Sequence, residues 1–212
     1  MEAGMSRKKT FISALLILCF SVSSLSALDF TYDANLSKAS DITLGLTLIT
    51  PGILGLIAPP SDYVAIGSSY AATMTGAYGM RTILKQVIHK PRPYVGQLDR
   101  PIDTSEDYES FPSGHSIMAF SAAAYAQAMQ LLFYPDSTTM KVVSATTWIL
   151  AATTATLRVV SGNHYLEDVL AGAAMGSAIG FLGPYITHQL LEKDTDAPTV
   201  LAGPVVGMQV SF

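Results

Sequence analysis

Residues 110–135 read SFPSGHSIMAFSAAAYAQAMQLLFYP, a short polar motif followed by a run without a charged residue. Ser113 stands just before the run, and serine is favoured at helix N-caps because its hydroxyl accepts a backbone N–H. The sequence therefore predicts a helix over 114–135. The N-terminus of such a helix offers free N–H groups and a positive dipole end to an anion. Gly114 lets an anion approach the backbone, and His115 stands beside that position in the first turn.

The rest of the chain is similarly apolar. Half of its 212 residues are hydrophobic and 13% are charged, against roughly 25% charged in ordinary soluble domains. Five stretches are almost free of charge: Ile42–Ser61, Tyr63–Met80, Ser116–Pro135, Val142–Leu157 and Val169–Leu191. Four have the roughly 17–25 residues of a transmembrane helix, and Val142–Leu157 falls just short. The predicted fold is an all-α bundle of five transmembrane helices, with a soluble helical protein of very apolar core as the alternative.

The two ends of the chain differ from this bundle. Residues 1–28 combine Arg7-Lys8-Lys9, a short apolar core and small polar residues, which is typical of an export signal. We expect either cleavage of this signal or its retention as a sixth transmembrane helix. Residues 29–191 would form the functional domain, and 192–212 a tail with a strand-like end.

Composition also excludes several classes of function and of site. The net charge is −4 and no basic block is present, so nucleic-acid binding is not expected. Cys19 is the single cysteine, which excludes an internal disulfide and a cysteine-based metal site. No cluster of acidic residues suits a pair of metal ions, so we expect catalysis without a metal or other cofactor.

The chain has two further motifs. One precedes the predicted helix 114–135, and the other follows the apolar stretch Val142–Leu157. The first is Lys85-x6-Arg92-Pro93, in which Pro91 and Pro93 hold Arg92 in extended backbone. A guanidinium held in this way can meet a phosphate with two parallel hydrogen bonds. Taken alone, the motif could equally be a basic cluster that binds lipid headgroups.

The second is Arg158-x5-His164-x3-Asp168. His164 and Asp168 are four residues apart, so on a helix they would share a face. The carboxylate could then accept one imidazole proton and leave the other nitrogen free to attack. The ordinary alternative is an ion pair that caps a helix.

The order of the apolar stretches places the three motifs together. If the chain starts inside and its stretches alternate across a membrane, the segments 85–113 and 158–165 both lie outside. The positive N-terminal residues weakly support this orientation. We therefore expect one site on the side of the membrane away from the cytoplasm.

Together the motifs resemble those of the type 2 phosphatidic acid phosphatase superfamily, which also includes bacterial class A acid phosphatases and vanadium haloperoxidases. That family's pattern is Lys-x6-Arg-Pro, Pro-Ser-Gly-His and Ser-Arg-x5-His-x3-Asp. The chain departs from it at Leu157, where the family usually has serine. The matching residues are Lys85, Arg92, Pro93, Pro112, Ser113, Gly114, His115, Arg158, His164 and Asp168.

The resemblance implies a role for each residue. His164 would attack phosphorus to form a phosphohistidine, Asp168 would orient it, and His115 would protonate the leaving oxygen and then activate water. The phosphate would be held by the remaining motif residues: Lys85, Arg92, Ser113, Gly114 and Arg158.

The sequence thus predicts a membrane phosphatase of the bacterial inner membrane whose active site faces the periplasm. Its substrate would be a lipid phosphate or pyrophosphate, such as phosphatidic acid, phosphatidylglycerol phosphate, undecaprenyl pyrophosphate or lipid A phosphate. The alternatives are a soluble periplasmic acid phosphatase with the same site, a vanadate-dependent haloperoxidase and a catalytically inactive lipid-binding scaffold.

Overall fold

The structure of the protein, a computed structural model, describes residues 30–53, 58 and 60–195. Over these residues it contains helices and no strand, which confirms the all-α prediction. The long helices are α2 (Ala34–Ile49), α4 (Tyr63–Val87), α5 (Gly114–Phe133), α6 (Thr138–Val160) and α7 (Leu166–Thr195). Two 3-10 turns, η1 (Thr50–Gly52) and η2 (Pro60–Asp62), lie between α2 and α4. The predicted signal over 1–28 and the strand-like end of the tail lie outside the described residues.

The caps of α5 and α6 follow the local sequence. The Ser113 hydroxyl accepts a hydrogen bond from the backbone N–H of Ser116 and so begins α5 where predicted. Ser137 does the same for Met140 at the start of α6. As a result α6 is longer than the predicted stretch 142–157 and includes Arg158 in its last turn.

The helix predicted over 42–61 is wrong in its bounds. Asp33 accepts hydrogen bonds from the backbone N–H groups of Asn35 and Leu36, so α2 begins at Ala34. Pro51 follows its last turn and lacks the N–H that a continuing helix needs. The helix therefore ends at Ile49 and contains Asp41 near its middle.

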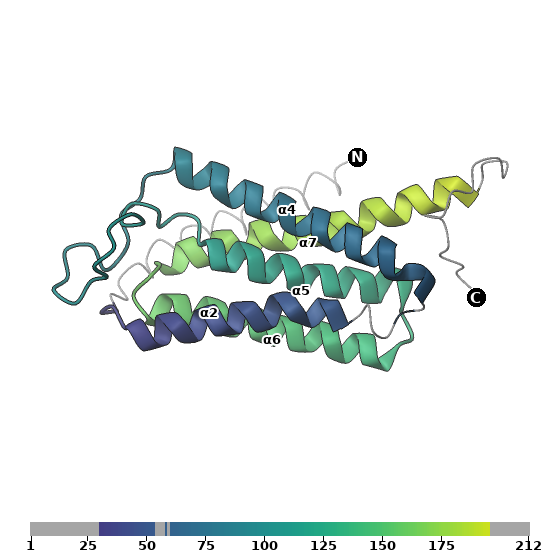
Figure 1. Ribbon diagram of the computed structural model, residues 1–212, viewed down its shortest axis with the longest axis horizontal. Helices are drawn as coiled ribbons and strands as arrows, with labels where there is room; N and C mark the ends of the chain where they lie inside the picture. The colour runs from purple at the N-terminus through teal and green to yellow at the C-terminus, as the bar shows by residue number, and fades with distance from the viewer. Residues whose placement is uncertain (1–29, 54–57, 59, 196–212) are drawn as a thin grey trace, which may run out of the picture.

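The bundle is organised around α5 (Figure 1), which packs against α7, α6, α4 and α2. In the view of Figure 1, α4 and α7 lie above α5, and α2 and α6 lie below it. Small side chains make this central position possible, because Ala122, Ala123, Ala124 and Ala126 are all fully buried. Small residues at these buried positions thus allow one helix to contact four others.

The contact between α5 and α7 depends on glycines spaced four residues apart. A Cβ on Gly172, Gly176 or Gly180 would overlap the α5 backbone around Ser113, Ile117 and Ser121 respectively. The absence of side chains lets the two backbones touch, as in tightly packed membrane helices. We call this contact the glycine seam.

Three helices of the described part of the chain are long and apolar enough to cross a membrane: Gly114–Phe133, Thr138–Val160 and Leu166–Gln189. Three of the five predicted spanning helices therefore have the length and composition of a membrane span. Helix α2 has 16 residues, and α4 carries Arg81 and Lys85 within its 25 residues. Large apolar residues are nevertheless exposed on the outer surface of both helices, for example Ile42, Ile49 and Ile83.

One end of the bundle collects all three motifs. The segment 88–113 leaves α4 and returns to α5 at the left of Figure 1, where the connection from α6 to α7 also lies. The prediction that the motifs fall on a single side of the bundle is confirmed.

Candidate active site

Each predicted residue lies where a helix begins or ends at this side of the bundle. Lys85 occupies the last turn of α4 and Arg158 the last turn of α6. Arg92 lies in the segment after α4, and all three basic side chains are buried. We call Lys85, Arg92 and Arg158 the cation cluster.

Asn163 links two members of this cluster. Its Oδ1 accepts hydrogen bonds from Arg158 Nη2 at 3.0 Å and from Arg92 Nη1 at 3.5 Å. Its own amide donates to Ser161 Oγ at 2.8 Å. One buried amide therefore sets two guanidinium groups side by side, although their charges repel.

His164 lies in the turn between α6 and α7, two residues before the first residue of α7. The prediction that His164 and Asp168 share a helix face is therefore wrong, because only Asp168 is helical. The turn contains Gly162 at φ 67°, a left-handed conformation that favours glycine. It nevertheless brings His164 Nδ1 to 3.8 Å from Asp168 Oδ2.

The environment of His164 favours the neutral imidazole. The residue is 2% exposed. Burial first, and then the positive charges of Arg92, Arg158 and Lys85, hold the pKa of His164 well below its usual value. Among the atoms that the structure describes, its buried Nδ1 has no hydrogen-bond partner. A neutral imidazole next to a carboxylate is the form that a histidine nucleophile needs.

Asp168 is fully buried in the first turn of α7. Its Oδ2 accepts hydrogen bonds from Ser110 Oγ at 2.5 Å and from the backbone N–H of Tyr165 at 3.0 Å. Its Oδ1 accepts one from Lys90 Nζ at 2.6 Å. The orientation of this carboxylate is thus fixed by groups outside the three motifs.

Two carboxylates of the segment before α5 form ion pairs with members of the cation cluster. Arg92 forms an ion pair with Glu106, and Lys85 Nζ lies 3.3 Å from Glu109 Oε2. Burial alone would raise the pKa of Glu106, but the charges of Arg92, Lys85 and Arg81 lower it below its usual value. Glu106 is therefore ionised, and the cation cluster holds anionic oxygens from the protein itself.

His115 has a partner that the sequence did not suggest. Its Nε2 lies 2.7 Å from Oδ1 of Asp41, which comes from α2. Arg158 is next to the same carboxylate, at 3.8 Å. Helix α2 also supplies the hydroxyls of Ser37 and Ser40 to Arg158 Nη1. Helix α2 is therefore a wall of the site as well as a packing element.

The two small residues of the second motif have distinct positions. Ser113 caps α5, and its backbone N–H donates to the carbonyl of Asp168 at 3.0 Å. A Cβ on Gly114 would lie 2.8 Å from Cδ of Arg81, so glycine is required for this arginine to cover the start of α5. Arg81 is a further cation that the motifs do not include.

Sequence reasoning missed several residues of this site, and some had a visible signal. Asp41 is an isolated charge in an apolar stretch, which is a functional candidate by default in a membrane protein. Asn163 and Lys90 had no such signal, because single polar residues in loops are common. Over the residues that the structure covers, no three His, Cys, Asp or Glu side chains are grouped to hold a metal ion.

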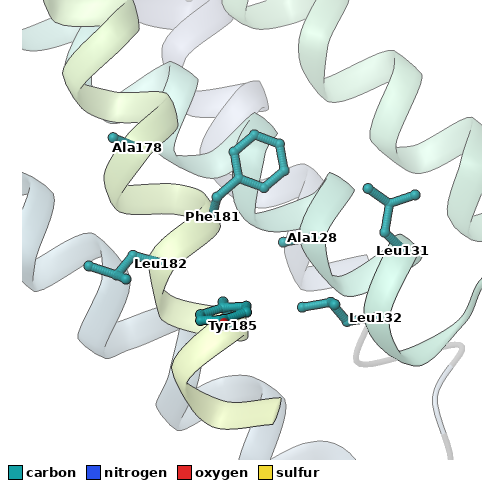
Figure 2. Close-up of a pocket in the computed structure, with 7 residues that line it drawn as sticks. All are labelled: Ala128, Leu131, Leu132, Ala178, Phe181, Leu182 and Tyr185. Carbon is teal, nitrogen blue, oxygen red and sulfur yellow. The ribbon is translucent and has the colours of Figure 1, made fainter. Parts of the chain in front are cut away.

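A separate hollow lies between α5 and α7 toward their C-terminal ends, about 20 Å along α5 from His115 at 1.5 Å per residue. Its volume is about 350 Å³, and its lining is almost wholly apolar. Figure 2 shows Phe181 and Tyr185 of α7 facing Leu131 and Leu132 of α5 across this hollow. It presents no cluster of reactive groups and is remote from the cation cluster.

Two known proteins are similar to this chain. A region of the lipid A 1-phosphatase of Porphyromonas gingivalis is 32% identical to this chain over 97 residues, which is 45% of the chain and 20% of that protein. The chain thus matches about a fifth of the length of this relative. The crystal structure of the first transmembrane PAP2 type phosphatidylglycerolphosphate phosphatase from Bacillus subtilis aligns with a TM-score of 0.49 and 19% identity. That alignment covers 89% of this chain and 90% of the other.

The family assignment rests on a longer match. The sequence model of the PAP2 superfamily matches residues 66–192, from α4 to the end of α7, and this range contains all three motifs. The chain belongs to the PAP2 superfamily.

Proposed function

We propose that the protein is a membrane phosphatase that hydrolyses a lipid phosphate or pyrophosphate through a phosphohistidine. The observation that carries this proposal is the buried His164, 3.8 Å from Asp168 and under the influence of the cation cluster. A buried neutral imidazole can attack phosphorus, and the guanidinium and ammonium groups around it attract the anionic phosphate. The family membership supports the same class of reaction.

In the first step, His164 attacks phosphorus. Its Nδ1 faces Asp168, so Nε2 is the nitrogen that forms the new P–N bond. The P–O bond to the leaving group breaks, and the leaving oxygen takes a proton from His115. The ring keeps its Nδ1 proton and becomes positive, and Asp168 stabilises it by accepting a hydrogen bond from Nδ1–H, as the aspartate does for histidine in serine-protease triads.

In the second step, water replaces histidine. His115, now neutral, removes a proton from the water as it attacks phosphorus. The P–N bond breaks, inorganic phosphate leaves, and His164 returns to its neutral form. In both steps the cation cluster stabilises the charge on the transferring oxygens, for which one lost donor typically costs on the order of 10²–10³ in rate.

The bundle supports a substrate that is itself in a membrane. The apolar helices end where the cation cluster begins, so a phosphate at the bilayer surface would meet the site while its hydrocarbon stays in lipid. Lipid A phosphate belongs among the candidates because a relative is a lipid A 1-phosphatase. Phosphatidic acid, phosphatidylglycerol phosphate and undecaprenyl pyrophosphate complete the set.

The test is phosphate release by purified protein in detergent from each of these four lipids, with excess chelator present. We expect turnover of at least one lipid, and a loss of at least about 10³-fold in the His164→Ala variant while lipid binding survives. Wild-type turnover should also produce a phosphoenzyme that is stable to alkali and labile to acid. Full activity of His164→Ala would remove the nucleophile assignment.

Two separate measurements test whether the protein is in the membrane and on which side of it the site lies. Carbonate extraction of membranes should leave the protein in the pellet, whereas release would favour a soluble periplasmic phosphatase. For orientation, Asp103→Cys in a Cys19→Ser background should react with a membrane-impermeant maleimide in intact spheroplasts. Reaction only after lysis would place the site on the cytoplasmic side.

A further inference from the structure

Lys90 occupies an unspecified position of the first motif, yet it contacts the active-site carboxylate. Its Nζ is 2.6 Å from Asp168 Oδ1 and 2.7 Å from Glu167 Oε1. The same ammonium lies 4.4 Å from the centroid of the Tyr165 ring. A flexible lysine side chain is therefore held at a defined position by two carboxylates and an aromatic face.

This lysine remains charged in its partly buried position. Burial lowers the pKa of Lys90, but its hydrogen bonds to Asp168 and Glu167 raise it more, so the balance lies above the usual value. Its side chain is 28% exposed, whereas Asp168 is fully buried. The ammonium of Lys90, which is partly exposed, thus places a positive charge against the buried carboxylate of Asp168.

Asp168 depends on that charge. Of the described cationic groups, Lys90 and His164 are those within ion-pair distance of its carboxylate. His164 is neutral at rest, so the compensating charge comes from Lys90. A buried carboxylate without a charged partner is strongly destabilised in its ionised form and takes up a proton instead.

The backbone of Lys90 adds a second connection to the same carboxylate. The Lys90 carbonyl accepts a hydrogen bond from the N–H of Ser110 at 3.0 Å. The Ser110 hydroxyl in turn donates to Asp168 Oδ2. Lys90 therefore acts on one carboxylate oxygen directly and positions the donor to the other.

We propose that Lys90 is a positioning residue that keeps Asp168 ionised and oriented, so that Asp168 can accept a hydrogen bond from Nδ1–H of His164 as the ring becomes positive during attack. This inference deepens the proposed function and rests on it. When Nε2 bonds to phosphorus, the ring becomes positive, and only an ionised Asp168 can stabilise that charge. The described contacts of its ammonium are with Asp168, Glu167 and the rings of Tyr165 and Phe111, so Lys90 acts on His164 through Asp168.

The principal test is the Lys90→Met variant, with Lys90→Arg as the conservative variant and Lys38→Met as a control. Lys38 is an exposed lysine on α2 at the same end of the bundle. We expect kcat of Lys90→Met to fall roughly 10- to 100-fold, the effect typical of losing an outer partner that orients a histidine. KM should stay within about 2-fold, Lys90→Arg should recover most of kcat, and Lys38→Met should equal wild type.

A pH profile separates this role from a merely structural one. The groups that face Asp168 are Lys90 and Ser110 from the segment before α5, and His164, Tyr165 N–H and Glu167 from its own segment. Lys90→Met removes the positive charge 2.6 Å from Asp168 Oδ1, so we expect the acid limb of kcat to move to higher pH. An unmoved acid limb would contradict the proposal.

A double-mutant cycle with Asp168→Asn decides whether Lys90 acts through Asp168. In the Asp168→Asn background, Lys90→Met should cause no further loss of kcat. An equal loss in both backgrounds, or wild-type kcat in Lys90→Met alone, would overturn the inference. If Lys90→Met does not fold, as judged by thermal unfolding in detergent, Lys90→Gln takes its place in the same cycle. A wild-type protein inactive on every lipid would instead refute the proposed function and the inference with it.

Discussion

Asp41 Oδ1 lies 2.7 Å from His115 Nε2, although 74 residues separate the two in the chain. The carboxylate comes from α2, which precedes the region matched by the PAP2 superfamily. A carboxylate at this distance accepts a hydrogen bond from the Nε2–H of His115 and fixes the direction of the ring. In the proposed mechanism, it would prepare His115 to protonate the leaving oxygen.

We predict that Asp41→Asn slows the first step most for poor leaving groups. A general acid contributes roughly 10²–10⁴-fold in total, and the loss of charge assistance should remove about 10-fold for an alkyl phosphate. A nitrophenyl leaving group needs no proton, so its transfer to His164 should change little. Rapid-quench measurement of phosphoenzyme formation with both substrates would show the difference, and equal slowing of both would refute this role.

The activity should persist in mildly acidic solution. Attack requires neutral His164, and its pKa is held below the usual value by burial and by the cation cluster. The neutral form therefore survives as pH falls through the range in which ordinary histidines become protonated. We expect the acid limb of kcat/KM, corrected for the ionisation of the substrate, to lie below 6.5. An acid limb at pH 6.5 or above would show that burial and the cation cluster do not lower the pKa of His164.

Glu106 should compete with substrate for Arg92, because both are anions for the same guanidinium. Since the Glu106 side chain is half exposed, its ion pair contributes only about 0.2–1 kcal/mol. We predict that Glu106→Gln lowers KM about 1.5- to 5-fold with little change in kcat. Asp103→Asn is the matched control, because Asp103 is an exposed carboxylate of the same segment. An unchanged or higher KM in Glu106→Gln would show that Glu106 supports the site.

The glycine seam should tolerate no side chain at its centre. In Gly176→Leu the new atoms would overlap the backbone of Ile117, so α7 must move away from α5. We expect a loss of about 1–3 kcal/mol or more in stability, together with loss of activity, because Ser113 and Asp168 meet at the same interface.

The control for the seam is Gly79→Ala in α4, where a Cβ meets no atom within 4 Å. This substitution should leave activity intact and slightly raise stability, since alanine favours helix. Thermal unfolding in one detergent would compare the two variants. Equal stability of Gly176→Leu and wild type would mean that the helices are not packed as closely as described.

Much of the site could be predicted from the sequence. Local residue preferences indicate where a helix begins, and the alternation of apolar stretches indicates which segments lie at the same end of the bundle. The Ser113 cap follows from residue type, and alternating apolar stretches place Lys85, Arg158 and His164 at one end. These inferences need only short-range sequence and the length of a helix.

The remaining contacts depend on tertiary packing that no local pattern encodes. Asp41 reaches His115 because α2 begins at Ala34, and that start was predicted too late. Lys90 reaches Asp168 because the segment before α5 folds back alongside α7. The position of His164 before α7 agrees with the predicted segment 158–165. The shared helix face of His164 and Asp168 was wrong because a spacing of four fits a turn as well as a helix.

Along the glycine seam, helices α5 and α7 meet backbone to backbone, and no side chain of Gly172, Gly176 or Gly180 lies between them. Such a pair moves as a rigid frame, and it carries Ser113, His115 and Asp168 together. If admission of a lipid headgroup needs a movement of the protein, we expect it in the elements around this pair, such as α4 and the segment that follows it. A spin label on that segment should shift its distance to α5 when substrate arrives, whereas a pair of labels across α5 and α7 should stay fixed.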